Sequence, residues 1–297
     1  MMKSFLRIGI SASLIISCFS LSAQNRPSFK AAVITPSAQV SEPVTVQHPW
    51  SGKKVLFIGD SISDCIAMSY VDKHYYDYLS DWLGITAYVP AISGMNWTHV
   101  ETQLNLFKQT AGEQVPDMIC IFLGTNDYNE GVPIGEWFTE EEKEVEAAMG
   151  KPKETFRRMY RSYVYSPETF KGRINSAIRL LKETYPTVPI TLLTPIHRAL
   201  FNFSDSNLQP EELYQNSCGE YLDAYVSAVK EASNVWSVNV IDLHAVSGMY
   251  PILEEDAALF YKDTVKDRLH PNEAGHRRLA EVLLYQSLVL PCRTIIP

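Results

Sequence analysis

Short apolar runs alternate along the chain with longer segments in which apolar residues recur every three or four positions. Five such runs stand out, at residues 55–58, 85–89, 118–123, 190–193 and 238–241. Several of them contain no polar residue, which is typical of strands covered on both faces. Because helix-like segments separate the runs, the pattern predicts five parallel strands connected by crossover helices.

Several helix boundaries can be placed from local sequence. Residues 166–168 (Ser-Pro-Glu) supply a capping hydroxyl, a first-turn proline and an acid, which predicts a helix start there and an end before Pro186. The last helix is expected to begin after Asn272, with His276 on its solvent-exposed face. Another helix is expected to start near Cys65, just after the first strand.

The chain has 297 residues, of which 46% are hydrophobic, so it is long enough for one large domain or two small ones. The alternating pattern predicts one domain over residues 53–297. Residues 24–52 are rich in proline and serine and read as an extended arm or linker. Residues 128–165 form an irregular insertion, in which the acidic run at 140–146 is expected to be a solvated helix face.

The first 23 residues have the features of an export signal. Lys3 and Arg7 precede an apolar stretch that is shorter than the roughly 20 residues needed to span a bilayer, and small residues follow at 22–23. The protein is therefore expected to be periplasmic or secreted. An alternative is a lipoprotein anchored through Cys18, because residues 15–18 resemble a lipobox.

Charge bears on the kind of partner that the chain can bind, and cysteine content bears on disulfides and metal sites. The formal net charge is −8, and no basic block interleaves with aromatic residues, which argues against nucleic acid as a partner. A small molecule or a glycan is expected instead, on the grounds given below. Cys120 lies in an apolar run and is expected to be a buried thiol. A disulfide between Cys218 and Cys292 is one alternative and two free thiols the other. No cysteine or histidine spacing typical of a metal site is present.

Polar clusters follow the predicted strands. Residues 59–61 (Gly-Asp-Ser) end the first, residues 92–96 follow the second, residues 124–127 (Gly-Thr-Asn-Asp) follow the third, and residues 267–271 precede the last helix. Ligands of open parallel sheets bind beyond the carboxyl ends of the strands. We therefore expect these clusters to converge on one site.

In this order the clusters resemble the four blocks of the SGNH hydrolase family, also called GDSL esterases. The resemblance implies a three-layer α/β/α, flavodoxin-like fold with a parallel sheet of order 2-1-3-4-5. It also implies hydrolysis of carboxylic esters without a metal or an organic cofactor.

The reactive groups themselves favour serine catalysis. A serine hydroxyl needs an imidazole to take its proton and an acceptor to orient that imidazole. Ser61, His270 and Asp267 are predicted to fill these roles, with the spacing of Asp267 and His270 suited to a turn or a first helical turn. The Ser61 amide, the Gly94 amide and the Asn126 side chain are the expected donors to the oxyanion.

Other residues near the strand ends are further candidates for the site, but their sequence patterns are less specific for catalysis or substrate binding. His244, two positions after Asp242, is an alternative base. Asp60, His197 and Trp97 are candidate substrate contacts. The alternatives are turn support for Asp60, a surface turn for His197 and core packing for Trp97.

Together these features predict an exported serine esterase that removes short acyl groups, most plausibly acetyl, from a carbohydrate. A lipase or lysophospholipase of the same family is one alternative. A non-catalytic carbohydrate-binding relative is another, although nothing in a binding role requires nucleophile, base and acid together.

Overall fold

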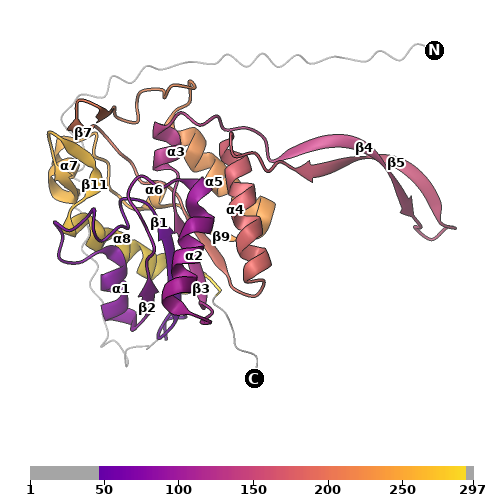
Figure 1. Cartoon of the computed structure of the whole chain (residues 1–297), viewed down its shortest axis with the longest axis horizontal. Coiled ribbons are helices and arrows are strands. Elements are labelled where there is room, and N and C mark those ends of the chain that lie inside the picture. The colour runs from indigo at the N-terminus through magenta and orange to yellow at the C-terminus, as the bar shows by residue number, and fades with distance from the viewer. Residues whose placement is uncertain (1–46, 292–297) are drawn as a thin grey trace, which may run out of the picture. The chain divides into compact units, whose positions relative to one another are not determined.

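A five-stranded parallel sheet lies at the centre of the computed structural model, which describes residues 47–291 (Figure 1). Its order is β2-β1-β3-β6-β9. The strands are β1 (Lys54–Gly59), β2 (Thr86–Tyr88), β3 (Met118–Phe122), β6 (Ile190–Leu193) and β9 (Asn239–Ile241). Each predicted apolar run supplies one strand, and their order is the predicted 2-1-3-4-5. The predicted α/β fold class is therefore confirmed.

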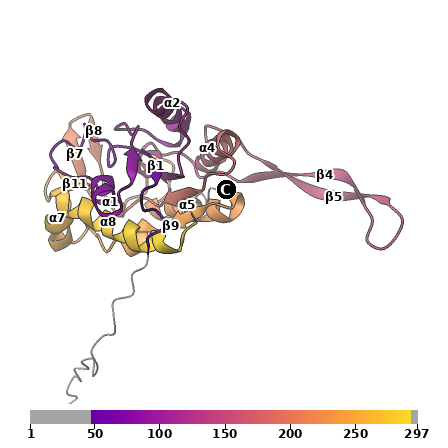
Figure 2. The ribbon, with the colours of Figure 1, turned by 90° about the horizontal axis from the view of Figure 1, so that it is seen from below.

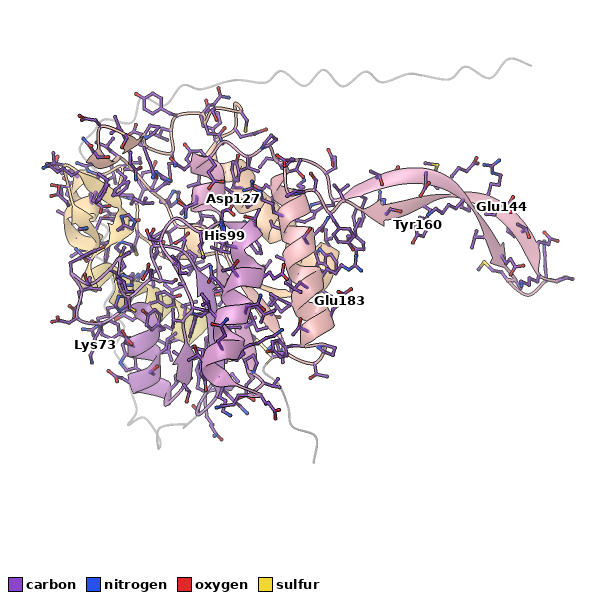
Figure 3. The ribbon with its side chains drawn as sticks, viewed as in Figure 1. Lys73, His99, Asp127, Glu144, Tyr160 and Glu183 are labelled. Carbon is purple, nitrogen blue, oxygen red and sulfur yellow. The ribbon has the colours of Figure 1, made fainter. Side chains whose placement is uncertain are left out.

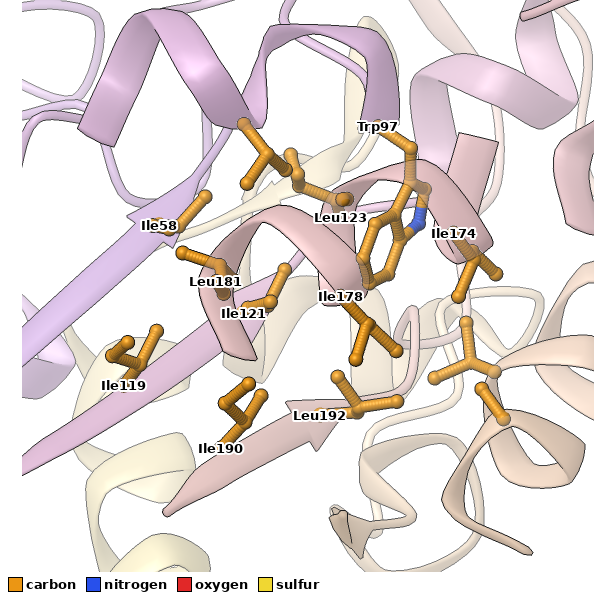
Figure 4. Close-up of a cluster of buried hydrophobic side chains, with 14 of the residues drawn as sticks. Ile58, Trp97, Ile119, Ile121, Leu123, Ile174, Ile178, Leu181, Ile190 and Leu192 are labelled. Carbon is orange, nitrogen blue, oxygen red and sulfur yellow. The ribbon is translucent and has the colours of Figure 1, made fainter. Parts of the chain in front are cut away.

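Both faces of the sheet are buried, because successive residues of a strand point to opposite sides. In β3, Met118 and Cys120 belong to one core cluster, whereas Ile119 and Ile121 belong to the other. Helices α1 (Tyr75–Leu83) and α8 (Glu273–Gln286) cover the first face, and α2 (Val100–Ala111), α4 (Phe170–Thr184) and α5 (Leu222–Trp236) cover the second. In Figure 4 the side chains of α4 lie against those of β3 and β6. Each fully buried aliphatic side chain contributes about 1.5–3 kcal/mol to folding.

Shorter elements lie in the connections. They are the 3₁₀ helix η1 (Trp97–His99) after β2, α3 (Thr125–Asn129) after β3, α6 (Leu243–Val246) after β9, α7 (Glu254–Phe260) and the 3₁₀ helix η2 (Ser287–Val289). Helices α3 and α6 begin directly beyond the carboxyl ends of their strands. Residues in these helices therefore lie at the edge where the polar clusters were predicted to converge.

A second, antiparallel sheet has the order β10-β11-β7-β8. Its strands are β10 (Tyr261–Asp263), β11 (Asp267–Pro271), β7 (Phe201–Ser204) and β8 (Asn207–Gln209). None of these short strands was predicted. Strand β11 contains both Asp267 and His270, so this small sheet determines where those side chains lie.

The insertion forms a β-hairpin, and the expectation of a helix for its acidic run was wrong. Strand β4 (Phe138–Ala147) contains the acidic run, and it pairs along its whole length with β5 (Glu154–Tyr163). Two glutamates of β4 lie opposite arginines of β5, Glu140 opposite Arg161 and Glu144 opposite Arg157, and the side chains of Glu140 and Arg161 are 2.8 Å apart. Cross-strand pairs of opposite charge favour this strand pairing over a helix. The hairpin projects away from α4 (Figures 1 and 2), and Figure 3 labels Glu144 and Tyr160 on it.

Two predicted helix starts were also wrong. No helix begins near Cys65, where the chain forms a series of turns before α1 starts at Tyr75. Helix α4 begins at Phe170 rather than at residues 166–168, although it ends at Thr184 as predicted. Helix α8 starts after Asn272, as predicted, and the Asn272 side chain accepts a hydrogen bond from the Gly275 amide.

His276 is buried rather than solvent-exposed, which corrects the prediction for the last helix. It lies on the same face of α8 as Leu279, Ala280 and Leu283, three, four and seven positions further on. Its ring stacks on that of Tyr75, with the two planes 9° apart. The buried face of α8 thus includes a histidine. The sequence pattern did not indicate this, because histidine is a polar residue.

Several predictions concern residues outside the described range of 47–291. These are the export signal at 1–23, the lipid anchor at Cys18, most of the arm at 24–52, and Cys292 as a disulfide partner of Cys218. The buried thiol predicted at Cys120 is confirmed. Within residues 47–291, no helix combines the length and the apolar character needed to cross a bilayer.

Candidate active site

Ser61 lies in a tight turn directly after β1. A Cβ atom at Gly59 would come within 2.5 Å of Ser63 Oγ, so the turn requires glycine there. The Asp60 carboxylate accepts a hydrogen bond from the Ile62 amide over 3.0 Å. The Asp60 main-chain carbonyl accepts two more, from the amides of Ser63 and Asp64. These bonds hold the turn that carries Ser61.

The glutamine at position 103 holds the end of β1. Its side-chain oxygen accepts from the Gly59 amide over 2.9 Å, and its side-chain nitrogen donates to the Gly59 carbonyl over 2.8 Å. Gln103 belongs to α2 and is completely buried. An amide that satisfies both backbone groups of one residue fixes the position from which the Ser61 turn departs. Gln103 could not be identified from the sequence, because a single glutamine in an amphipathic helix carries no signal of this role.

Ser61, His270 and Asp267 form a continuous hydrogen-bonded chain. Ser61 Oγ lies 2.9 Å from His270 Nε2, although the two residues are 209 positions apart. His270 Nδ1 lies 2.9 Å and 3.0 Å from the two carboxylate oxygens of Asp267. Since an ionised carboxylate only accepts, Nδ1 carries the ring proton, which leaves the lone pair of Nε2 facing the serine hydroxyl. All three residues are buried.

Asp267 and His270 lie in strand β11, not in the turn or helical turn that their spacing suggested. The Asp267 carboxylate also accepts the main-chain N–H of His270 over 3.0 Å, which brings the two side chains to the same side. β11 pairs with β7, where Asp267 lies opposite Phe201. The Phe201 ring meets the His270 imidazole edge to face, with centroids 4.9 Å apart. The small sheet therefore positions the imidazole in two ways: β11 carries His270, and Phe201 of β7 packs against the imidazole ring.

One cavity of about 330 Å³ brings these groups together with the two other predicted oxyanion donors. Ser61, His270 and Asp267 line it, as do Gly94 and Asn126. Gly94 has a φ of 80°, a left-handed conformation that favours glycine.

Three hydrogen bonds join the loops around this cavity. The Asn126 side-chain amide donates to the Met95 carbonyl over 2.8 Å. The Asp127 carboxylate accepts from the Trp97 amide over 3.3 Å, and it pairs with Arg173 at 2.8 Å. Burial nevertheless raises the pKa of Asp127 to about 6. Asp64 accepts from the Ser93 amide over 2.9 Å, a contact that the sequence did not indicate.

The predicted substrate contacts lie outside the lining of this cavity. Trp97 is 1% exposed and packs against Phe170 in the core, as expected from the alternative of core packing. Asp60 is buried beneath Ser61 and supports the turn, and burial raises its pKa to about 7. His197 pairs with Glu212 instead, at a distance of 2.6 Å.

Five other residues of the small antiparallel sheet, which the sequence did not indicate, also line the cavity. Phe201, Phe203, Asn207 and Gln209 come from β7 and β8, and Lys262 comes from β10. The sequence pattern around these residues is weak, because strands of three or four residues show hardly any periodicity. The alternation of Phe201 and Phe203 is the one pattern that could have indicated a strand here.

His244, the alternative base, is part of a different cluster. Its ring lies against that of His197, with centroids 3.5 Å apart, whereas His270 occupies the position next to the Ser61 hydroxyl. Burial and the neighbouring His197 lower the pKa of His244. Among residues 47–291, His197, Glu212 and His244 form the one group whose donor atoms lie close enough to hold a metal ion.

Comparison with known proteins gives a family and a fold. The model of the GDSL-like lipase/acylhydrolase family matches residues 57–278, which include all four polar clusters. A protein from Lactobacillus plantarum is 23% identical, with a TM-score of 0.58, over 80% of this chain and 96% of that one. A protein from Chitinophaga pinensis, described as a possible lipase, is 19% identical, with a TM-score of 0.57, over 79% of this chain and 97% of that one. No curated protein matches the sequence.

Proposed function

Because the chain belongs to the GDSL-like lipase/acylhydrolase family and is a carboxylic ester hydrolase, we propose that it is an exported serine esterase that removes short acyl groups, acetyl above all, from a carbohydrate. The observation that supports this most strongly is the hydrogen-bonded chain from Ser61 through His270 to Asp267, which opens into the same cavity as Gly94 and Asn126. These five residues supply every group that acyl transfer to serine requires.

The reaction begins with attack of Ser61 Oγ on the ester carbonyl carbon, while His270 Nε2 takes the hydroxyl proton. Asp267 keeps the Nδ1 proton in place and stabilises the imidazolium that forms. The carbonyl oxygen becomes an oxyanion, to which the amides of Ser61 and Gly94 and the Asn126 side chain donate hydrogen bonds. Asn126 Nδ2 carries two hydrogens, so one remains for the oxyanion beside the bond to Met95.

Collapse of this intermediate breaks the bond to the alcohol oxygen. His270 gives its proton to that oxygen, and the sugar leaves with a free hydroxyl group. A water molecule then attacks the acyl-Ser61 carbonyl and gives its proton to His270. The second oxyanion collapses to release the carboxylic acid, and Ser61 Oγ takes the proton back.

The cavity lining favours a short acyl group on a polar alcohol. Polar side chains make up a large part of it, including Ser93, Asn207, Gln209 and Lys262, whereas a long acyl chain requires continuous apolar walls. Phe203 is 76% exposed at the cavity and offers the kind of flat aromatic face on which a sugar ring packs. The amide side chains of Asn207 and Gln209 can bond sugar hydroxyls.

Acyl-chain preference tests this proposal. Protein comprising residues 24–297 is expected to hydrolyse nitrophenyl acetate fastest, with the rate falling from acetate to octanoate and palmitate. It is also expected to release acetate from at least one polysaccharide in a panel of acetylated glycans. Ser61→Ala, the matched control, should lower kcat by at least about 10³-fold. A rate that rises with chain length would identify a lipase, and absence of turnover in both proteins would identify a binding relative.

Export is proposed from residues 1–23, with cleavage after Ala23 and location in the periplasm or the medium. Fractionation of cells expressing the full chain, followed by sequencing of the mature N-terminus, tests this. A mature protein that begins at Cys18 and incorporates a palmitate analogue would instead show the lipoprotein alternative.

A further inference from the structure

Three ionisable side chains meet at the carboxyl edge of the parallel sheet, on strand ends other than the one that carries Ser61. His197 follows β6 and His244 follows β9, and these two strands are neighbours in the sheet. Glu212 comes from the segment after β8. Because the carboxyl ends of neighbouring parallel strands share one edge, the fold brings the two histidines together although 47 positions of sequence separate them.

The three side chains form a compact group. One donor atom from each lies within 4.8 Å of the others. His197 Nδ1 is 2.6 Å from Glu212 Oε1, and the two imidazole rings have centroids 3.5 Å apart with planes inclined by 35°. The side chains of His197, Glu212 and His244 are 21%, 7% and 14% exposed, so most of the group is shielded from bulk water.

The group leaves one polar atom unsatisfied. His244 Nδ1 is buried and has no hydrogen-bond partner, and the other ring nitrogen of His244 is 3.6 Å from Asp223 Oδ1, too far for a hydrogen bond. A buried polar atom without a partner costs about 1–3 kcal/mol. Two imidazoles and a carboxylate held this closely, with a ring nitrogen unpaired, form an arrangement that a cation would complete.

We propose that His197, Glu212 and His244 bind a divalent transition metal ion, with Zn²⁺ as the best fit. Two imidazoles and one carboxylate are a common zinc donor set, whereas Mg²⁺ and Ca²⁺ prefer oxygen ligands. Bonds of about 2.0–2.1 Å around tetrahedral zinc place donor atoms a little over 3 Å apart, so small side-chain rotations bring this group into range. The fourth position would be filled by water or by Asp223, whose carboxylate is 85% exposed and free to turn inward.

The protein scaffold already orients two of the ligands. Glu212 Oε2 accepts the main-chain N–H of Arg198 over 2.8 Å, whereas Oε1 lies against His197 Nδ1, where the metal would take the place of the proton that these two atoms share. The Tyr261 hydroxyl donates to the His197 carbonyl over 2.7 Å. Such outer hydrogen bonds fix ligand orientation in protein metal sites. The sequence contains no metal-site spacing, because the three ligands come from different segments that meet only in the folded chain.

None of the three ligands lines the cavity that contains Ser61, so the metal would act on stability rather than on the ester. Downstream of His197, the Ala199 amide donates to the Arg268 carbonyl and the Arg268 amide donates to the Leu200 carbonyl, each over 2.9 Å. These bonds join the metal-binding segment to β11, which carries Asp267 and His270. An ion bound to the folded chain alone raises the unfolding temperature by mass action.

Metal binding can be measured without reference to activity. Residues 24–297, freed of any affinity tag and treated with chelator, are dialysed against micromolar Zn²⁺, and bound zinc is determined by elemental analysis. We expect about one zinc ion per chain, together with a rise in melting temperature. Co²⁺ should give visible absorption bands of a tetrahedral site that Zn²⁺ removes and Mg²⁺ leaves unchanged.

Variants assign the ligands. His244→Ala and Glu212→Gln are each expected to lose the bound zinc, whereas Glu211→Gln and Cys218→Ser, the matched controls, are expected to keep it. Circular dichroism of each chelator-treated variant verifies folding, and His244→Ala serves if Glu212→Gln fails to fold. Zinc content that stays the same in folded His244→Ala, or absence of zinc from the wild-type chain, would overturn the proposal. Hydrolysis of nitrophenyl acetate is recorded separately, so failure of the metal site is distinct from failure of the proposed esterase function.

Discussion

Asp64 accepts a hydrogen bond from the Ser93 amide over 2.9 Å, and this bond joins the turn that carries Ser61 to the loop that carries Gly94. The second oxygen of Asp64 accepts from the Ile66 amide over 2.8 Å, so the carboxylate is held from both sides. The bond therefore holds the proposed nucleophile, Ser61, in place relative to Gly94, a proposed oxyanion donor, and acyl transfer to serine depends on that alignment.

Removal of this bridge should slow the chemical step. Asp64→Ala is expected to lower kcat for nitrophenyl acetate by about tenfold or more with little change in KM, because small misplacements of reacting groups are costly. Asp64→Asn should recover part of the loss, since its amide oxygen can still accept from Ser93. Asp72→Ala, at an exposed position, is the control. A rise in KM alone would mean that Asp64 shapes binding instead of alignment.

Asn126 is expected to act on the transition state. Asn126→Ala should reduce kcat by about 10²–10³-fold, the effect of losing one oxyanion donor, and leave KM nearly unchanged. Asn129→Ala, in the same helix but exposed, should retain wild-type rates. Steady-state kinetics of both variants provide the measurement. Equal rates for the two would remove Asn126 from the proposed oxyanion hole.

His276 should make the protein sensitive to acid. Burial lowers the pKa of His276 to about 3, from an ordinary value near 6.5. As the pH falls below 6.5, the unfolded chain takes up a proton that the folded chain refuses until about pH 3. The stabilising effect of the neutral ring is therefore complete above pH 6.5 and is lost as the pH falls, by up to about 1.4 kcal/mol per pH unit.

Urea unfolding at several values between pH 4 and pH 7.5 tests this dependence. His276→Leu should flatten the dependence of unfolding free energy on pH over this range, whatever its stability at pH 7.5. Comparison with the wild-type chain isolates His276, because the buried carboxylates of Asp60 and Asp127 contribute to both curves. Parallel curves for the two proteins would contradict the prediction.

The β4–β5 hairpin should be dispensable for hydrolysis. The Asn175 side-chain amide donates to the Trp137 carbonyl over 3.0 Å and to the Val164 carbonyl over 2.8 Å, and so holds the base of the hairpin independently of its strands. Replacement of residues 139–162 by a short Gly-Ser linker is expected to leave kcat/KM for nitrophenyl acetate within about twofold, because long surface insertions contribute little to domain stability. A loss of activity with folding intact would show that the hairpin contributes to the site.

Local sequence predicted the central sheet well because its signal is strong. Residues 118–123 are apolar throughout, and a strand buried on both faces needs that composition wherever it occurs. The prediction failed for β11, because Asp267 and His270 adopt a strand only through pairing with β7 and β10. It also failed for the acidic run of β4, which forms a strand by pairing along its whole length with β5. In both cases the strand conformation depends on pairing with a partner strand, and the local periodicity of a segment does not show which strand it will pair with.

The order of apolar and polar positions along the chain located the buried strands and the polar residues that follow them, because a strand covered on both faces needs a continuous apolar run. It therefore predicted the parallel sheet and the candidates Ser61, Asp267 and His270. The sequence could not show that Ser61 Oγ lies 2.9 Å from an imidazole 209 positions away, or that His197, Glu212 and His244 form one group of neighbouring side chains. Contacts between distant segments depend on how strands pair and helices pack, and those interactions exist only in the folded chain.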